Sequence, residues 1–220
     1  MGVLDPVVPR VLATRIIPRI DRSLAAAFGF DGDRLNAAGL ITCDLDDALY
    51  AALDEATKHA GVEVVFARSF YAGSAHASGA TSGEILGILA GTDPEEVARG
   101  LGACVRCLES EAHFYSANAD GSVTFFPHVI SSLGHYLSRE AGLAVGEPMA
   151  YLIATPLESV YAVDAALKAA EVRLVKHFPP PTETNYAGAY LTGSLEACEA
   201  AAKAFAAAVV EVATEPRRPR

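Results

Sequence analysis

The sequence lacks the features that mark a membrane, secreted or nucleic-acid-binding protein. No apolar run approaches the roughly 20 residues that cross a bilayer, and the N-terminus has no basic and apolar regions of a secretory signal. Four cysteines in 220 residues are too few for a secreted disulfide scaffold. Basic residues number 17 against 27 acidic ones, so the formal net charge is −10. Because an acidic surface repels phosphate backbones, we expect a soluble cytoplasmic protein that binds neither membrane nor nucleic acid.

The motifs of an enzyme or a metal protein are also missing. There is no Gly-rich nucleotide fingerprint after a strand, no P-loop and no G-x-S-x-G turn. Among the six histidines only His128 and His135, seven residues apart, have a spacing that could share a helix face, and we expect a structural or surface role for each. Cys104 and Cys107 form a C-x-x-C, but they lie on the apolar stripe of an expected helix rather than at its N-terminus. We therefore predict buried thiols, no catalytic residue, no metal site and no required cofactor.

What the sequence does contain is one α/β unit repeated in tandem. Residues 40–65 and 152–175 both read as an apolar strand, a turn with an acid, an amphipathic helix and a β-branched strand. Asp54 matches Asp164 at an offset of 110 residues, whereas the opening strands match at an offset of 112. One connection therefore differs by two residues between the copies.

The flanking segments agree in order as well. Each copy continues with a strand that ends in Gly and a hydroxyl residue, followed by a helix for which Thr92 or Asp93 in the first copy and Ser194 in the second can serve as caps. Each copy is also preceded by a strand and a helix, expected at residues 11–17, 23–28, 123–126 and 128–138. Each copy thus reads β-α-β-α-β-β-α, and we place the two domains at residues 1–110 and 111–220.

The two copies differ mainly in one loop. Residues 68–83 of the first copy are long, rich in Gly, Ser and Ala, and flexible by composition. Residues 178–186 of the second copy begin with a stiff polyproline stretch. A loop as long as the first one is usually functional or disordered in a compact domain, and its placement favours a functional role.

This repeat resembles the bacterial microcompartment shell domain in its circularly permuted tandem form. The resemblance covers essentially the whole chain, and it rests on the runs DEATK (54–58), VEVV (62–65), RSFYAGSAH (68–76), PLESVYAVDAALK (156–168) and PPPTETNY (179–186). It implies an α+β fold of two tandem, circularly permuted ferredoxin-like shell domains.

The resemblance also implies a function without catalysis. Relatives of this type are structural tiles of the shell of a cytoplasmic microcompartment, here of the ethanolamine-utilisation type. They form homotrimers whose six domains make a pseudohexamer, and they pack with other shell proteins into a sheet. Three-fold closure brings the same loop of three chains to one axis. The loop that resembles the gate of this central pore contains Phe70, Tyr71, Ala72, Gly73, Ser74 and His76.

Smaller pores lie within each subunit in this family. The positions that match their lining, and that contact ethanolamine in relatives, are Asp46, Asp47, Phe114, Glu158, Thr182 and Glu183. Clustered carboxylates with an aromatic ring suit a small protonated amino alcohol, through charge pairing and cation–π contact. Asp46 and Glu158 could instead serve only their helix N-termini, for about 0.5 kcal/mol each through the helix dipole. One residue can do both.

Two alternatives to the ethanolamine shell stay open at this point. The compartment could process another amine or a diol, because a fold does not fix a substrate. The chain could also be a cytosolic small-molecule sensor or enzyme on the same duplicated fold, although its sequence supplies no catalytic set.

Overall fold

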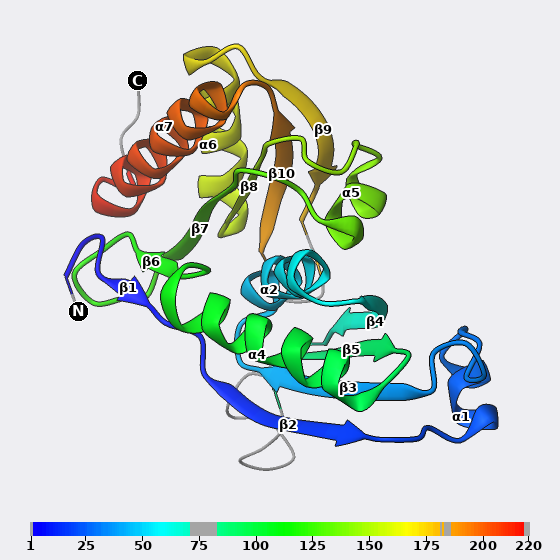
Figure 1. Ribbon diagram of the computed structural model, residues 1–220. Coiled ribbons are helices and arrows are strands. Elements are labelled where there is room, and N and C mark those ends of the chain that lie inside the picture. Colours follow the sequence, from blue (N-terminus) through cyan, green and yellow to red (C-terminus); the bar gives the residue numbers. More distant parts are fainter. Residues whose placement is uncertain (1, 71–82, 181, 183–185, 218–220) are drawn as a thin grey trace. The chain divides into compact units, whose positions relative to one another are not determined.

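The computed structural model describes residues 2–70, 83–180, 182 and 186–217 (Figure 1). The chain divides into two compact units. The N-terminal unit contains Pro9–Ala112 together with Gly134–Leu137. The C-terminal unit contains Met1–Val8, His113–Leu133 and Ser138–Arg220.

The N-terminal unit is a four-stranded antiparallel sheet in the order β2-β3-β5-β4. Its elements are β2 (Val11–Ile17), α1 (Arg22–Ala27), β3 (Ala37–Cys43), α2 (Asp46–His59), β4 (Val62–Ser69), β5 (Ile85–Gly91) and α4 (Pro94–Ser110).

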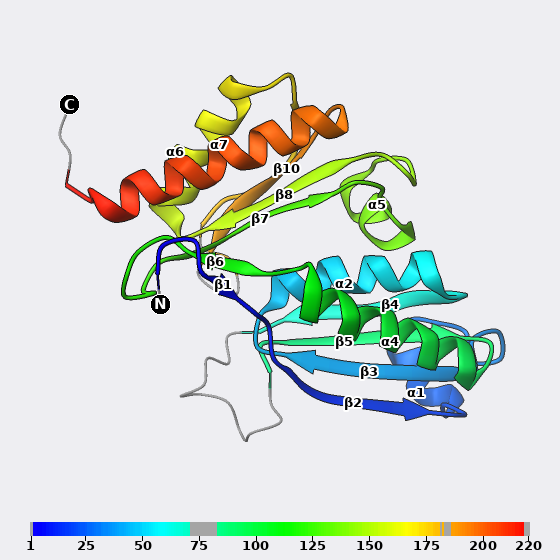
Figure 2. The ribbon, with the colours of Figure 1, turned by 60° about the vertical axis from the view of Figure 1, so that its left-hand side comes forward.

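Helices α2 and α4 lie side by side on one face of this sheet (Figure 2). Gly39 of β3 allows this close packing, because a Cβ there would lie 2.6 Å from the side chain of Val97 on α4. On the other face, Ile20 and Ala25 at helix α1 pack against Ala38 of the sheet. Apolar side chains thus cover both faces of the sheet.

The C-terminal unit holds a six-stranded antiparallel sheet in the order β1-β6-β7-β8-β10-β9. Helices α6 and α7 pack together over one face of it (Figure 2). The elements of the unit are β1 (Pro6–Val7), β6 (Phe114–Ser116), β7 (Thr124–Ile130), β8 (Met149–Ala154), α6 (Pro156–Ala169), β9 (Arg173–Phe178), β10 (Ala187–Thr192) and α7 (Leu195–Thr214). Helix α5 (His135–Ala141) begins in the N-terminal unit, at residues 135–137.

The duplication predicted from the sequence is confirmed. The strand order β2-β3-β5-β4 of the first copy recurs as β7-β8-β10-β9 in the second, with helices at the same places in the chain. The expected caps are also present. The Asp93 carboxylate accepts the backbone N–H groups of Glu95 and Glu96 at 2.9 Å each, and Ser194 Oγ accepts that of Ala197 at 3.2 Å.

The N-terminal residues add strands that the repeat alone does not contain. Pro6 and Val7 pair with Tyr115 and Phe114, so β1 and β6 extend the sheet beside β7. Residues 1–8 therefore group with the second half of the chain. The division into shell domains at residues 1–110 and 111–220 stays a prediction.

The helix expected at residues 128–138 is wrong. His128, Val129 and Ile130 continue strand β7, where they pair with Tyr151, Ala150 and Met149 of β8, and the helix begins only at His135. The four-residue spacing of Val129, Leu133 and Leu137 imitated a helical stripe. Pairing with a neighbouring strand, which the local pattern does not reveal, decided the outcome. No helix among the described residues is long and apolar enough to cross a bilayer.

Candidate functional site

Two of the predicted pore carboxylates begin helix α2. Asp46 and Asp47 form its first turn, and each residue exposes only 7% of its surface. The preceding residue, Leu45, gives the helix no side-chain cap. Because the first N–H groups of a helix carry partial positive charge, acids at these positions are stabilised by the helix dipole. The dipole interpretation therefore holds for both residues and does not exclude a second role.

The hydroxyl of Tyr50 lies one turn further along the helix and ties this cluster to the end of β4. Tyr50 Oη donates to Ser69 Oγ at 3.1 Å and accepts the backbone N–H of Ser69 at 2.9 Å. Burial raises the pKa of Tyr50 to about 12, and the negative charges of Asp46 and Asp47 add to the shift. The tyrosine hydroxyl therefore stays protonated beside two acids.

Ser69 is the last residue of β4, directly before the predicted gate residue Phe70. The Phe70 N–H donates to the carbonyl of Glu84 at 2.8 Å, and the residue is 43% exposed. The Tyr50 hydroxyl thus fixes the backbone where the long loop leaves the sheet. Sequence reasoning missed Tyr50 and Ser69, because nothing local links positions 19 residues apart.

In the C-terminal unit, Tyr186 gathers two of the other predicted residues. Phe114 is buried and stands edge-on to the Tyr186 ring at 5.9 Å between centroids. Thr182 Oγ1 donates to the Tyr186 carbonyl at 2.8 Å, and the Tyr186 hydroxyl bonds Thr124 Oγ1 at 2.6 Å. Tyr186 lies in the proline-containing loop named from the sequence, but it was not predicted as a site residue.

Glu158 lies in the first turn of α6, where its Oε2 accepts the Thr155 hydroxyl at 2.5 Å. It is the third residue of its helix, whereas Asp46 is the first residue of α2. The strands preceding the two helices start 112 residues apart and the helices 110 apart. Glu158 therefore matches Asp46 when counted from the strand, but it matches Ala48 within the helix.

The predicted small-pore set is thus divided between the two units. Asp46 and Asp47 stand together in the N-terminal unit, while Phe114, Glu158 and Thr182 belong to the C-terminal unit. Glu183 lies outside the described residues. So do five of the six predicted gate residues, namely Tyr71, Ala72, Gly73, Ser74 and His76. The assignments to the two pores stay predictions.

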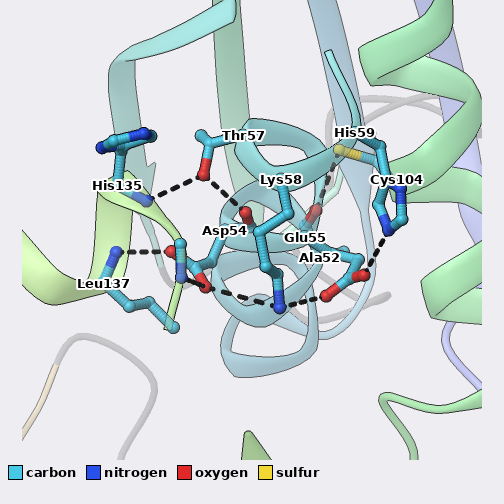
Figure 3. A network of polar contacts seen from close by, with 10 residues as sticks. Ala52, Asp54, Glu55, Thr57, Lys58, His59, Cys104, His135 and Leu137 are labelled. Atoms are coloured by element: carbon cyan, nitrogen blue, oxygen red, sulfur yellow. Dashed lines mark hydrogen bonds and ion pairs between the residues drawn. The ribbon is translucent and has the colours of Figure 1, made fainter. Parts of the chain in front are cut away.

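One further carboxylate is wholly buried. The side chain of Asp54 on α2 is 0% exposed. Its Oδ2 accepts the N–H of Gly134 at 2.7 Å and its Oδ1 that of Leu137 at 2.8 Å (Figure 3). Thr57 Oγ1 donates to the Asp54 carbonyl at 2.7 Å and accepts the His135 N–H at 3.0 Å. Two side chains of α2 therefore accept backbone N–H groups at the start of α5, where a helix has no intrahelical acceptors of its own.

Burial is the main influence on the ionisation of Asp54. Burial raises the pKa of this carboxyl, although the two backbone N–H groups and the nearby Lys58 ammonium act in the opposite direction. The Lys58 Nζ lies 3.9 Å from Asp54 Oδ2 and also pairs with Glu55. This network is structural in its geometry, because every polar atom of the carboxylate points at backbone or at Lys58.

The thiols are buried as predicted. Cys43, Cys104, Cys107 and Cys198 are all reduced and buried. Burial raises the pKa of Cys43 and of Cys107 to about 12, so neither forms a thiolate at neutral pH. Within the described part of the chain, no group of three or more His, Cys, Asp or Glu side chains could hold a metal ion.

Comparison with known proteins agrees with this architecture. The model of the BMC domain matches residues 37–119. The bacterial microcompartment shell protein EutL of Clostridium perfringens is 50% identical over 212 residues, which cover 96% of this chain and 97% of that protein.

Solved structures give the same result. The crystal structure of the ethanolamine utilization protein EutL from Leptotrichia buccalis superposes with a TM-score of 0.96, at 50% identity and full coverage of both chains. A trimeric bacterial microcompartment shell protein, PduB, has a TM-score of 0.74 at 17% identity over 93% of this chain and 89% of its own, and this likeness shows the fold alone. The predicted α+β fold of tandem shell domains is confirmed.

Proposed function

Because this chain belongs to the EutL family of bacterial microcompartment shell proteins, we propose that it assembles as a homotrimer with a gated central pore and small pores for a protonated amino alcohol. Membership in the family by itself establishes the general role of the protein. The protein is a structural component of a microcompartment shell of the ethanolamine-utilisation type, and it is not an enzyme.

The observation that carries the proposal is the duplication. Two copies with one strand order allow three chains to supply six similar units, which is the number a hexagonal tile requires. The two copies have unlike loops at 68–83 and 178–186, so a three-fold axis would bring only one kind of loop together. This difference favours one central pore gated by residues 70–76, and a tile that packs with other shell proteins.

Charge supports the choice of solute. Asp46 and Asp47 stand side by side at the start of α2, and Glu158 lies in the first turn of α6. Carboxylates at a narrow opening attract a small cation and repel anions. Ethanolamine combines an ammonium group with a hydroxyl, and the Thr182 hydroxyl oxygen is a suitable hydrogen-bond acceptor for such a group.

Assembly is tested first. Sedimentation velocity at about 100 μM should give three copies per particle, and electron microscopy of concentrated protein should show flat hexagonal arrays. A strictly monomeric protein, or one that never forms arrays, would contradict the tile.

Solute binding is tested separately by calorimetry. Ethanolamine should bind more weakly to Asp46→Asn and Glu158→Gln than to the unchanged protein, whereas Asp164→Asn serves as the control because Asp164 is exposed and paired with Lys168. A neutral diol of equal size, 1,2-ethanediol, should bind less than ethanolamine, since it lacks the charge. Equal binding of the diol, or equal affinity in all variants, would remove the ligand assignment and leave the shell role intact.

A further inference from the structure

The two copies bury the same helix surface to different extents. Helices α2 and α6 are 14 residues each and start 110 residues apart, so Asp54 and Asp164 occupy the same helix position. The Asp54 side chain is 0% exposed, whereas that of Asp164 is 61% exposed and pairs with Lys168 at 2.6 Å. Another part of the structure therefore covers α2 at Asp54, and the equivalent surface of α6 at Asp164 is left uncovered.

The uncovered surface of α6 is apolar. Leu157 is 66% exposed and Val160 53% exposed, and Tyr161 beside them is also exposed. With Asp164 they are spaced i, i+3, i+4 and i+7, so they form one stripe along the helix. We call the three apolar residues, Leu157, Val160 and Tyr161, the α6 stripe. Exposed side chains of this size on one stripe are typical of an interaction surface.

On α2 the corresponding position is covered by the segment Gly134–Leu137 (Figure 3). Leu137 is 1% exposed. The ring of Tyr136 lies 6.5 Å from that of Tyr50, which corresponds to Val160 of the stripe. The covering segment therefore buries its own Leu137 and donates backbone N–H groups to Asp54.

The first copy contains a counterpart of this covering segment. Strands β2 and β7 end at Ile17 and Ile130, and helices α1 and α5 begin at Arg22 and His135, an offset of 113 in both cases. Residues 21–24 therefore correspond to Gly134–Leu137. Leu24, the counterpart of the buried Leu137, is 43% exposed. One chain thus presents an uncovered stripe and an unused covering segment.

We propose that the α6 stripe of one copy binds residues 21–24 of a second copy. This inference rests on the proposed homotrimer and identifies the surfaces that join its subunits. Leu24 in the N-terminal unit and Leu157 and Val160 in the C-terminal unit are all exposed, so both surfaces are available to a second copy. The contact joins two different surfaces and is therefore head-to-tail, which is the kind of interface that closes into a ring.

Within one chain, the backbone of Gly134–Leu137 makes polar contacts with Asp54. We expect the contact between two copies to be apolar instead. Asp21 stands at the position of Gly134, and its carboxylate already accepts the Ser23 N–H at 2.8 Å. A Cβ at Gly134 would lie 2.6 Å from the Asp54 carbonyl oxygen, so a residue with a side chain cannot approach a helix that closely. The Asp54 arrangement is therefore not repeated, and Leu24 against Leu157 and Val160 supplies the contact.

Three matched variants test the proposal by sedimentation velocity over a concentration series. Val160→Glu and Leu24→Glu place a charge on either side of the contact. Val145→Glu makes the same change at an equally exposed valine (53%) outside both surfaces. The unchanged protein and Val145→Glu should assemble alike, while each of the other two should raise the dissociation constant at least tenfold. Circular dichroism checks that all three are folded.

Mixing the two interface variants makes the test directional. A Leu24→Glu chain keeps its α6 stripe and a Val160→Glu chain keeps its segment 21–24, so one intact contact can form between them. We expect a 1:1 heterodimer from two monomeric proteins. If Leu24→Glu assembles like the unchanged protein, residues 21–24 take no part and the proposal fails.

The same experiment separates this inference from the proposed function. An unchanged protein that is monomeric would overturn the homotrimer itself. If the unchanged protein forms trimers and the Val160→Glu variant, measured separately, forms equally stable trimers, only the assignment of these surfaces is overturned.

Discussion

Replacing Asp54 with asparagine should destabilise the N-terminal unit more than any change at its counterpart in the second copy. Asp54 uses both carboxylate oxygens to accept backbone N–H groups, from Gly134 at 2.7 Å and from Leu137 at 2.8 Å. Asparagine keeps the shape but offers only one acceptor oxygen, and its amide would point an N–H at a backbone N–H. One of two buried donors is then left without an acceptor.

The magnitude follows from these contacts. A buried donor without a partner costs about 1–3 kcal/mol, and the remaining hydrogen bond loses the additional strength that a charged acceptor gives. Removal of a buried charge offsets part of this cost. We expect Asp54→Asn to lower the free energy of unfolding by about 2–3 kcal/mol. Asp164→Asn, in an exposed pair with Lys168, should change it by about 0.5 kcal/mol or less.

Urea unfolding at one fixed protein concentration measures both variants, because assembly makes stability depend on concentration. The midpoint should shift for Asp54→Asn and stay nearly constant for Asp164→Asn, with equal slopes. Equal shifts for the two variants would contradict this prediction, because the Asp54 carboxylate is buried and that of Asp164 is exposed.

The contribution of Asp54 to the unfolding free energy should change with pH in one direction. Burial raises the pKa of Asp54 in the folded protein, so folding favours the protonated carboxyl. The stability it contributes is fully present below the unfolded-state pKa of about 4 and is lost as the pH rises through the folded-state pKa. Because asparagine does not titrate, the gap in unfolding free energy between the unchanged protein and Asp54→Asn should narrow as the pH rises from about 4. A gap that widens over this range would contradict the assigned cause.

Two other predictions concern the same unit. Gly134→Ala should lower the unfolding free energy by about 2 kcal/mol, because its Cβ would lie 2.5 Å from Thr57 Oγ1. Gly142→Ala is the control for backbone strain, because a Cβ there would have no atom within 4 Å while φ is +66°. Equal losses of stability in the two variants would show that crowding is not the cause. Cys43 and Cys107, whose pKa burial raises to about 12, should react with a disulfide reagent at pH 8 only after unfolding; rapid reaction of the native protein would show that burial does not protect them.

The candidate site was predictable only in part. The sequence located the acids at the helix starts, since Asp46 and Glu158 follow apolar strands in a repeated pattern. It did not reveal Tyr50 and Ser69, which meet through a hydroxyl although they are 19 residues apart. It also counted Glu158 as the equivalent of Asp46, because the two-residue change in the connection could not be placed before the helix starts were known.

The duplication, the order of the elements and the apolar faces that build the two sheets could be predicted from the amino-acid sequence. These follow from periodicity, which is local and recurs in both copies. The tertiary structure alone decided that residues 128–130 continue a strand, and that Asp54 is buried while Asp164 is exposed. Both aspartates have a lysine four residues later, so their local patterns agree. The difference is physical and long-range: a segment 80 residues further along the chain covers one helix and leaves the other open.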